Sequence, residues 1–326
     1  MINVAFIGVS HWHLPLYLNP ILALPDVRIV GVADPDSAVA ARVAADLGCE
    51  SAEDYRDLIA RVRPDFVFAL GEHADMPAEA EYLIDADVAF AMEKPCGTSG
   101  PQVTALADKA EEKGAFAAVP LVLRQSDFLT EIERRSADEG YTYLSFKLIG
   151  RPPDRYLTEG SAWMTERSAA GGGALINLGI HYIDLIACLG KSDDIEVLAA
   201  TTSSAAWNLS IEDYALVTLR AGTTIGTVET GYLYPSSGAA YMDMHYSLRT
   251  PGHYYVARDS SHLEVSTSSG VTETIDVGTT NISYYPRFCA DVLRRFAARE
   301  KPVAGLREAA RAMTILDDVY QAGGRR

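Results

Sequence analysis

The chain has 326 residues, of which 48% are hydrophobic and 22% charged, and its formal net charge is −16. A chain of this length usually divides into two domains, and its composition is that of an ordinary globular protein. The negative charge repels phosphate backbones and anionic lipid surfaces, so we expect neither nucleic acid nor a membrane as a partner.

The cysteines and the first residues predict a cytoplasmic protein. The four cysteines form no CxxC pair, and we expect reduced thiols at Cys49, Cys96, Cys188 and Cys289. No basic region or long apolar stretch marks a signal peptide at the N-terminus. No run of about 18 apolar residues predicts a membrane-spanning helix.

The first 120 residues alternate short apolar runs with helical segments. The predicted strands cover residues 2–8, 27–33, 65–70, 88–92 and 115–119. Amphipathic helices are predicted between them at residues 37–47, 76–84 and 100–113. Strands that alternate with helices indicate right-handed crossovers and a parallel sheet with both faces covered. We therefore expect a doubly wound α/β domain.

The pattern becomes dominated by strands after residue 121. A helix over 127–137 precedes a strand over 141–149, and an amphipathic helix follows at 175–189. Further strands are predicted at residues 195–202, 213–220, 224–232, 241–249, 254–257, 262–266 and 271–277. Glycine and short polar residues separate them, as in an antiparallel meander. The last predicted elements are helices over 286–298 and 306–322.

The loop after the first predicted strand keeps part of a dinucleotide-binding fingerprint. Of the pattern G-x-G-x-x-G/A, only the first glycine, Gly8, is present. Ser10 is small enough to stand for the second glycine and can hydrogen-bond a phosphate oxygen. His13 is bulkier than the glycine or alanine expected there. We expect His11, Trp12 and His13 to face the cofactor or the cleft, because two histidines are too few for a metal site.

Asp34 ends the second predicted strand, about 20 residues beyond the loop, where an acidic side chain accepts hydrogen bonds from ribose hydroxyls. A carboxylate there repels the 2′-phosphate of NADP, and no arginine directly follows it. NAD is therefore favoured over NADP. The alternative is that Asp34 only begins a turn.

Two motifs that lie far apart in the sequence supply proton-handling side chains. Glu93-Lys94-Pro95 follows the fourth predicted strand, so Lys94 should project from the carboxyl edge of the sheet. His181 ends the run that begins at Gly171, and it shares a helical face with Asn177. Hydride transfer from a carbinol carbon requires removal of the hydroxyl proton, which suits an imidazole that titrates near neutrality. An ammonium group can stabilise the developing alkoxide.

The order of these parts resembles the glucose–fructose oxidoreductase and inositol dehydrogenase family (Gfo/Idh/MocA). The shared parts are the glycine loop, Asp34, Glu93-Lys94-Pro95, the run from Gly172 to Asp184, and Lys301-Pro302-Val303. The resemblance implies an N-terminal Rossmann domain over residues 1–120. It also implies an α/β domain with a large, mostly antiparallel sheet over residues 121–326, which binds substrate and forms homodimers or homotetramers. Whether the helix over 306–322 packs back on the first domain stays open.

The resemblance implies an NAD(P)-dependent dehydrogenase or reductase acting on a hydroxyl of a sugar, cyclitol or polyol-like substrate. Lys94 and His181 would handle the proton, and Asn177 would position the hydroxyl. The family usually has aspartate at position 177, and asparagine cannot accept a proton, so His181 is the expected base. Asp184 would orient the imidazole or pair elsewhere. The resemblance adds Arg124 and Trp163 as substrate-binding candidates, and Gly71, His73, Glu93 and Lys94 as cofactor-binding candidates.

Two other functions stay open. A bound NAD could oxidise a sugar transiently, so that elimination, hydrolysis or epimerisation follows without net redox change. The incomplete glycine fingerprint and Asn177 are also compatible with an inactive protein that binds or senses a ligand. The substrate, the oxidised carbon and the reaction direction are not indicated by the sequence.

Overall fold

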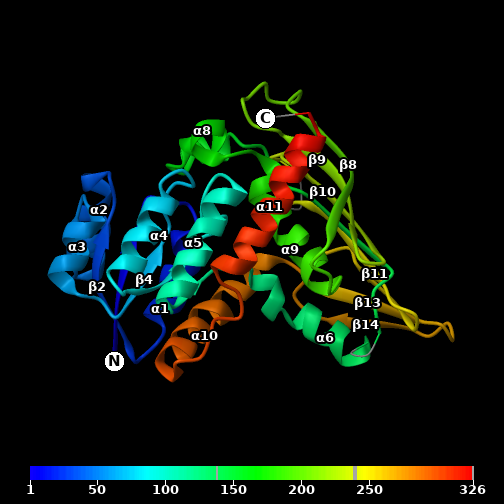
Figure 1. Cartoon of the computed structure of the whole chain (residues 1–326), viewed down its shortest axis with the longest axis horizontal. Coiled ribbons are helices and arrows are strands. Elements are labelled where there is room, and N and C mark those ends of the chain that lie inside the picture. The colour runs from blue at the N-terminus through cyan, green and yellow to red at the C-terminus, as the bar shows by residue number, and fades with distance from the viewer. Residues whose placement is uncertain (137–138, 238–240, 325–326) are drawn as a thin grey trace.

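Two β-sheets with helices packed against them form the computed structural model of the chain (Figure 1), which describes residues 1–136, 139–237 and 241–324. Within these residues, the first sheet has six strands in the order β3-β2-β1-β4-β5-β6. The second has eight strands in the order β14-β13-β12-β11-β7-β10-β9-β8. Both the parallel Rossmann sheet and the mostly antiparallel second sheet are confirmed.

The first sheet is parallel throughout the described residues. Its strands are β1 (Ile2–Ile7), β2 (Val27–Ala33), β3 (Glu50–Ala52), β4 (Phe66–Ala69), β5 (Ala89–Met92) and β6 (Ala117–Ala118). The helices around it are α1 (Leu14–Leu22), α2 (Ser37–Leu47), α3 (Tyr55–Val62), α4 (Met76–Asp85) and α5 (Gly100–Lys113). Every residue of β4 is buried, because helices cover both faces.

Three elements of this first domain, α1, α3 and β3, lie where the sequence predicted none. Helix α1 carries Pro20 inside it and a second proline in its first turn, which hides its helical pattern. Helix α3 has eight residues and strand β3 has three, so their periodicity is too short to read.

The second sheet consists of β7 (Tyr143–Ile149), β8 (Ile195–Ser203), β9 (Tyr214–Ala221), β10 (Thr224–Gly231), β11 (Asp243–Arg249), β12 (His253–Ala257), β13 (His262–Thr267) and β14 (Thr272–Asp276). The expected antiparallel meander is wrong at β7, because this strand pairs with β10 in parallel and with β11 antiparallel. This early strand lies between two later groups of hairpins. The predicted strand over 241–249 begins at Asp243.

The remaining helices of the described residues fall into a short and a long group. The short ones are η1 (Val122–Gln125), α7 (Arg155–Thr158), η2 (Ala162–Thr165), α8 (Arg167–Ala170), the π-helix η3 (Leu175–Gly179) and η4 (Asn281–Tyr284). The long ones are α6 (Asp127–Ser136), α9 (Ile180–Leu189), α10 (Tyr285–Ala298) and α11 (Leu306–Ala322). Residue 137, the last of the predicted helix over 127–137, lies outside the described residues.

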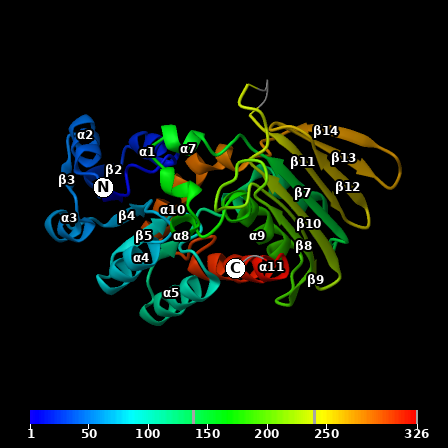
Figure 2. The same cartoon turned by 90° about the horizontal axis from the view of Figure 1, so that it is seen from above.

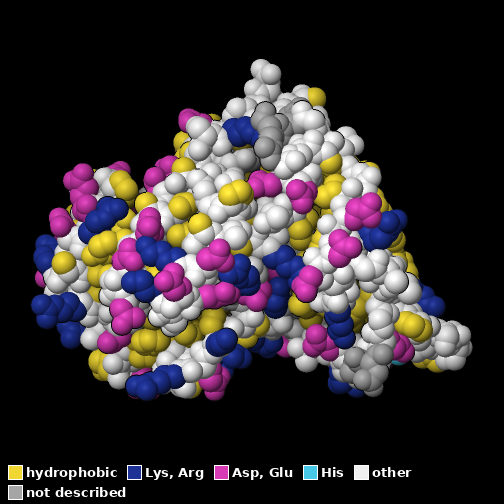
Figure 3. Space-filling model, viewed as in Figure 1, with side chains coloured by type: hydrophobic (Ala, Val, Ile, Leu, Met, Phe, Trp, Pro, Cys, Tyr) yellow, Lys and Arg dark blue, Asp and Glu magenta, His cyan; other side chains and the backbone are white. Residues whose placement is uncertain are grey.

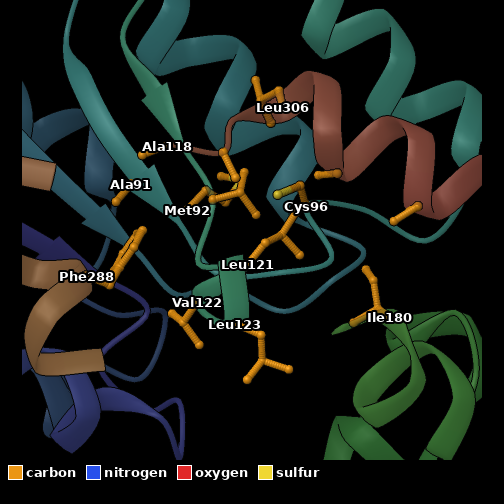
Figure 4. Close-up of a cluster of buried hydrophobic side chains, with 14 of the residues drawn as sticks. Ala91, Met92, Cys96, Ala118, Leu121, Val122, Leu123, Ile180, Phe288 and Leu306 are labelled. Carbon is orange, nitrogen blue, oxygen red and sulfur yellow. The ribbon is translucent and has the colours of Figure 1, made fainter. Parts of the chain in front are cut away.

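Helix α11 lies between the two sheets, where it packs against α5, α9 and β8 (Figure 2). Helix α10 packs against α1. Apolar side chains from both halves of the chain meet beyond the end of β5 (Figure 4), among them Met92, Leu121, Ile180 and Phe288. Cys96 belongs to this cluster, so the loop that carries Lys94 rests on a continuous core.

The sequence expectation of no membrane-length apolar helix needs one correction. Among the described residues, the stretch Arg167–Leu189, which runs from α8 through η3 to α9, is long and apolar enough to cross a membrane, with a mean hydropathy of 1.5 over its best window. However, 89% of that window is buried inside the fold. Packing of α9 against β9, β10 and α11 accounts for the apolar composition.

Charged side chains of both signs are interspersed over the face shown in Figure 3. Lysines and arginines lie next to aspartates and glutamates there. Among the described residues, Lys109 pairs with Glu81 and Asp85, 3.0 and 2.7 Å away. That face therefore offers no continuous basic surface to a polyanion.

Candidate active site

Lys94 lies just beyond the carboxyl end of β5 and points at the start of the helix that carries His181. The peptide bond between Lys94 and Pro95 is cis. Lys94 is only 2% exposed, and its Nζ donates hydrogen bonds to the Asn177 backbone oxygen at 3.0 Å and to Asn177 Oδ1 at 2.6 Å. Burial lowers the pKa of Lys94, while Glu93, 4.0 Å away, opposes that shift. The fold thus joins two motifs that are separated by more than eighty positions.

A buried network holds the Asn177 amide. Its Nδ2 donates to the hydroxyl of Tyr156 at 2.7 Å and to that of Tyr232 at 3.0 Å. These bonds orient Oδ1 toward Lys94, because the amide nitrogen is fully used by the tyrosines. Neither tyrosine belongs to a motif that the sequence analysis identified. Their positions before and after the helix gave no spacing signal.

The glycine run before Asn177 is explained by close packing. A Cβ on Gly173 would lie 1.9 Å from the Glu212 backbone oxygen, and one on Gly172 would lie 2.1 Å from the Tyr320 hydroxyl. The Glu212 carboxylate accepts hydrogen bonds from the backbone N–H groups of Gly173 and Leu175 at 2.8 and 3.0 Å. Asn177 then lies in η3, a π-helical turn of the kind often found at functional sites.

His181 is buried near Lys94 and is held by a residue that the sequence did not indicate. Its Nε2 lies 3.2 Å from Asn281 Nδ2, and its Nδ1 has no partner among the described residues. Burial, followed by the charge of Lys94, lowers the pKa of His181 to about 3. The expectation of an imidazole that titrates near neutrality is therefore wrong, and the side chain is a neutral imidazole at physiological pH.

Asp184 does not orient His181. It accepts two hydrogen bonds from Arg124, from Nε at 2.8 Å and from Nη2 at 2.7 Å. Arg124 lines a cavity of about 750 Å³ together with Cys188 and Arg311, and this cavity does not include Lys94, Asn177 or His181. The geometry thus gives no support to the expected contact between Arg124 and a substrate held at Lys94.

The loop between β1 and α1 adjoins a second cavity, of about 180 Å³, at the carboxyl ends of β1 and β2. Gly8, at φ +74°, and the 2%-exposed Asp34 line it. The Asp34 carboxylate accepts hydrogen bonds from the N–H of Ser10 at 2.6 Å and of Asp36 at 2.9 Å. It therefore begins a turn, as the alternative had it, and still has lone pairs free for ribose hydroxyls. Arg56 of α3, which the sequence did not point to, lines the same cavity.

These features fit a dinucleotide. A Cβ on Gly8 would lie 2.5 Å from the Leu70 carbonyl, so glycine allows the loops after β1 and β4 to meet. An acidic side chain ends β2 beside this glycine, and a cavity lies between them. The residues present can thus hold the adenosine end of NAD.

A cluster of rings lies between this loop and the second domain. His73 stacks edge-on against Trp163 with a centroid separation of 4.8 Å, and its Nδ1 lies 2.8 Å from the Ala170 backbone oxygen. The ring centroids of His11 and Trp163 are 5.8 Å apart, and those of Trp12 and His13 are 3.6 Å apart. The fold thus brings together the five ring side chains that the sequence analysis proposed as cofactor or substrate contacts: His11, Trp12, His13, His73 and Trp163.

Burial sets the charge state of this cluster. It lowers the pKa of His11, of His13 and of His73, the last to about 3, so the three rings are neutral. Among the described residues, no group of three or more His, Cys, Asp or Glu side chains could hold a metal ion. The cluster is therefore a neutral wall beside Lys94.

Glu93 connects the ring cluster to the catalytic candidates. Its Oε2 accepts a hydrogen bond from the Tyr17 hydroxyl and lies 3.4 Å from His13 Nδ1. His13, the bulky residue at the third fingerprint position, therefore turns toward Glu93. The sequence did not single out Tyr17, which lies in α1, a helix that the sequence did not predict.

Comparisons with known proteins agree with this arrangement. The oxidoreductase family with an NAD-binding Rossmann fold matches residues 2–120, and the GFO/IDH/MocA C-terminal domain matches residues 148–249. The chain is 24% identical over 280 residues to the putative UDP-kanosamine synthase oxidoreductase subunit of Amycolatopsis mediterranei (strain S699), covering 83% of this chain and 74% of that protein.

Two solved structures share the whole fold. Levoglucosan dehydrogenase in complex with NADH and levoglucosan superposes with a TM-score of 0.84 at 16% identity, covering 99% of this chain and 97% of that chain. UDP-N-acetylglucosamine 3-dehydrogenase GnnA from Acidithiobacillus ferrooxidans superposes with a TM-score of 0.80 at 19% identity, covering 98% of this chain and 97% of that chain.

Proposed function

Because the chain belongs to the Gfo/Idh/MocA oxidoreductase family, we propose that it transfers a hydride between NAD and a hydroxyl or keto carbon of a sugar, cyclitol or polyol-like substrate. The observation that carries the proposal is the buried contact between Lys94 and Asn177, with His181 one helical turn further on. The two similar solved structures, one of which binds NADH and levoglucosan, support this substrate class.

Residues 1–120 would hold the cofactor, and residues 121–326 would supply most of the substrate site. The cofactor contacts we propose are Gly8, Ser10, His11, Trp12, His13, Asp34, Gly71, His73, Glu93 and Lys94. NAD is preferred to NADP because the buried Asp34 carboxylate repels a 2′-phosphate. When bound, the nicotinamide supplies the hydride acceptor or donor.

The proton is handled by Lys94 and His181. Lys94 Nζ donates to the substrate oxygen and stabilises the negative charge that develops on it, which is effective because the site is buried. His181 is neutral, and because the amide nitrogen of Asn281 can only donate to Nε2, the lone pair of the ring lies on Nε2. Nε2 would accept the hydroxyl proton when the substrate takes the place of Asn281. Asn177 holds the lysine in place, and the second lone pair of its Oδ1 can accept a hydrogen bond from the substrate hydroxyl. Trp163, in the ring cluster, forms the substrate-side wall.

Assembly and location complete the proposal. We infer a cytoplasmic homodimer or homotetramer whose partner in catalysis is a small molecule. Sedimentation of the purified chain measures the oligomeric state directly, and a monomer at micromolar concentration would refute that part.

The test is a screen of sugars, cyclitols and polyols with NAD, followed by absorbance of NADH. On any substrate found, His181→Ala should reduce kcat by about 10²–10⁴-fold and leave the Kd for NAD nearly unchanged. Lys94→Met should be equally impaired, whereas the matched surface variant Lys109→Met should keep wild-type turnover. Wild-type kcat in His181→Ala would refute the assigned base.

A ligand-binding protein without turnover is the second candidate, and one observation favours it. Lys94 and Asn177 satisfy each other's hydrogen bonds, so the pair can act as a structural link between the domains. Calorimetric titration with NAD separates the candidates. Binding together with NADH formation supports the oxidoreductase, and no binding at millimolar NAD supports the sensor. Product that carries solvent deuterium without NADH accumulation would instead indicate NAD-assisted chemistry without net redox change.

A further inference from the structure

Glu79 is a buried acid on α4, and its carboxyl group occupies the space that a side chain at position 71 would need. It is 7% exposed, and the Gly71 N–H hydrogen-bonds to its carboxyl group. A Cβ on Gly71 would lie 2.3 Å from Glu79 Oε1 and 2.5 Å from Oε2. A larger residue at position 71 would therefore have to displace the end of the Glu79 side chain, and with glycine there the carboxyl group occupies that space.

The Glu79 carboxyl group forms part of the wall of the dinucleotide cavity. Glu79 lines the cavity of about 180 Å³ together with Gly8 and Asp34, the two residues assigned to NAD. Its Oε2 is buried and has no hydrogen-bond partner among the described residues. A buried polar oxygen without a partner is unfavourable in a folded protein, so its position at a cavity wall points to a ligand.

The charged groups around Glu79 favour its neutral form. Burial raises its pKa to about 8, and the nearby carboxylates of Asp75 and Asp34 add to that effect. The Gly71 N–H and Arg56 oppose it without cancelling it. The remaining titratable groups at this cavity are Glu53 and Tyr55. At neutral pH, Oε2 can therefore carry a proton and act as a hydrogen-bond donor.

We propose that Glu79 binds the cofactor as a neutral carboxylic acid and donates a hydrogen bond from Oε2 to an oxygen of the ribose–pyrophosphate part of NAD. This inference rests on the proposed NAD-dependent function. Above the pKa, the group loses its donor and becomes a third negative charge beside Asp34 and Asp75. The affinity for an anionic dinucleotide is thus greatest below that pH and falls as the pH rises through it.

Calorimetric titration with NAD and with ADP-ribose at pH about 6.5 and about 9.5 tests the proposal. If only the protonated form binds well, the Kd of the wild-type chain rises tenfold per pH unit above the pKa, or about 30-fold at the higher pH. Glu79→Gln keeps a neutral donor of the same shape, so its Kd should stay flat. Glu81→Gln, an exposed change on the same helix, should keep the wild-type pH dependence.

Each outcome decides the matter. A flat wild-type Kd, or a Glu79→Gln variant that follows the wild type, overturns the role of Glu79 while NAD binding itself stands. No binding of NAD or ADP-ribose to the wild type overturns the proposed function and this inference with it. If Glu79→Gln does not fold, infrared difference spectra of the wild type decide instead. A protonated carboxyl band that shifts on ADP-ribose binding supports the proposal, and an unchanged band refutes it.

Discussion

Removal of the Asn177 amide should lower the stability of the fold, because three buried polar side chains form hydrogen bonds with it. In Asn177→Ala, Lys94 Nζ loses its 2.6 Å acceptor, and the hydroxyls of Tyr156 and Tyr232 each lose a donor. A hydrogen bond to a charged group contributes about 1.5–3 kcal/mol, and each neutral one about 1 kcal/mol. The free energy of unfolding should therefore fall by about 3–5 kcal/mol.

The variant Asn177→Asp separates hydrogen bonding from size. Its carboxylate can accept from Lys94 and from both tyrosine hydroxyls, which rotate to donate. Its free energy of unfolding should lie within about 1 kcal/mol of the wild type, and the lysine pKa should rise because it gains a counter-charge. Urea unfolding followed by circular dichroism measures all three chains, with Asn19→Ala as an exposed control. An Asn177→Ala chain as stable as that control would refute the reasoning.

Three further outcomes are expected. In histidine NMR titrations, the imidazoles of His73 and His181 should stay neutral between pH about 5.5 and 8, because burial lowers the pKa of each to about 3. Burial also lowers the pKa of His11 and of His13, so both should titrate below pH 6.5. A resonance that moves near pH 6.5 would contradict the prediction for its residue. Asp34→Asn should lower the ratio of the NADP Kd to the NAD Kd by about tenfold, since Arg56 shares the cavity. Asp184→Asn should cost about 3–5 kcal/mol of stability, because it breaks the ion pair with Arg124. The Kd for NAD should stay unchanged in calorimetry, and a rise in it would show that the pair supports the cofactor site.

Much of the fold could be predicted from local sequence pattern. The run that became β4 is continuously apolar and that of β1 is interrupted only by Asn3, which is typical of strands buried on both faces. Pattern failed where the chain pairs over long distances. The parallel contact between β7 and β10 joins segments that are about eighty residues apart, and no local period encodes which strands become neighbours.

The residues of the candidate site also separate into those that local sequence pattern could predict and those that it could not. Lys94 and Asn177 could be named because each belongs to a short motif, and the fold brings them within 2.6 Å. Tyr17, Tyr232 and Asn281 could not, because nothing in their spacing separates a tyrosine or asparagine with a buried partner from one in the core or on the surface.

The sequence by itself determined which residue types are available: an ammonium after β5, an imidazole on α9 and a carboxylate after β2. Only the tertiary structure decided their states. A pKa depends on burial and on charges brought from elsewhere in the chain, so the pKa of His181 falls to about 3 and that of Glu79 rises to about 8 through contacts that no local pattern contains. Arg124 was likewise drawn to Asp184, since the fold places that carboxylate 2.7 Å away.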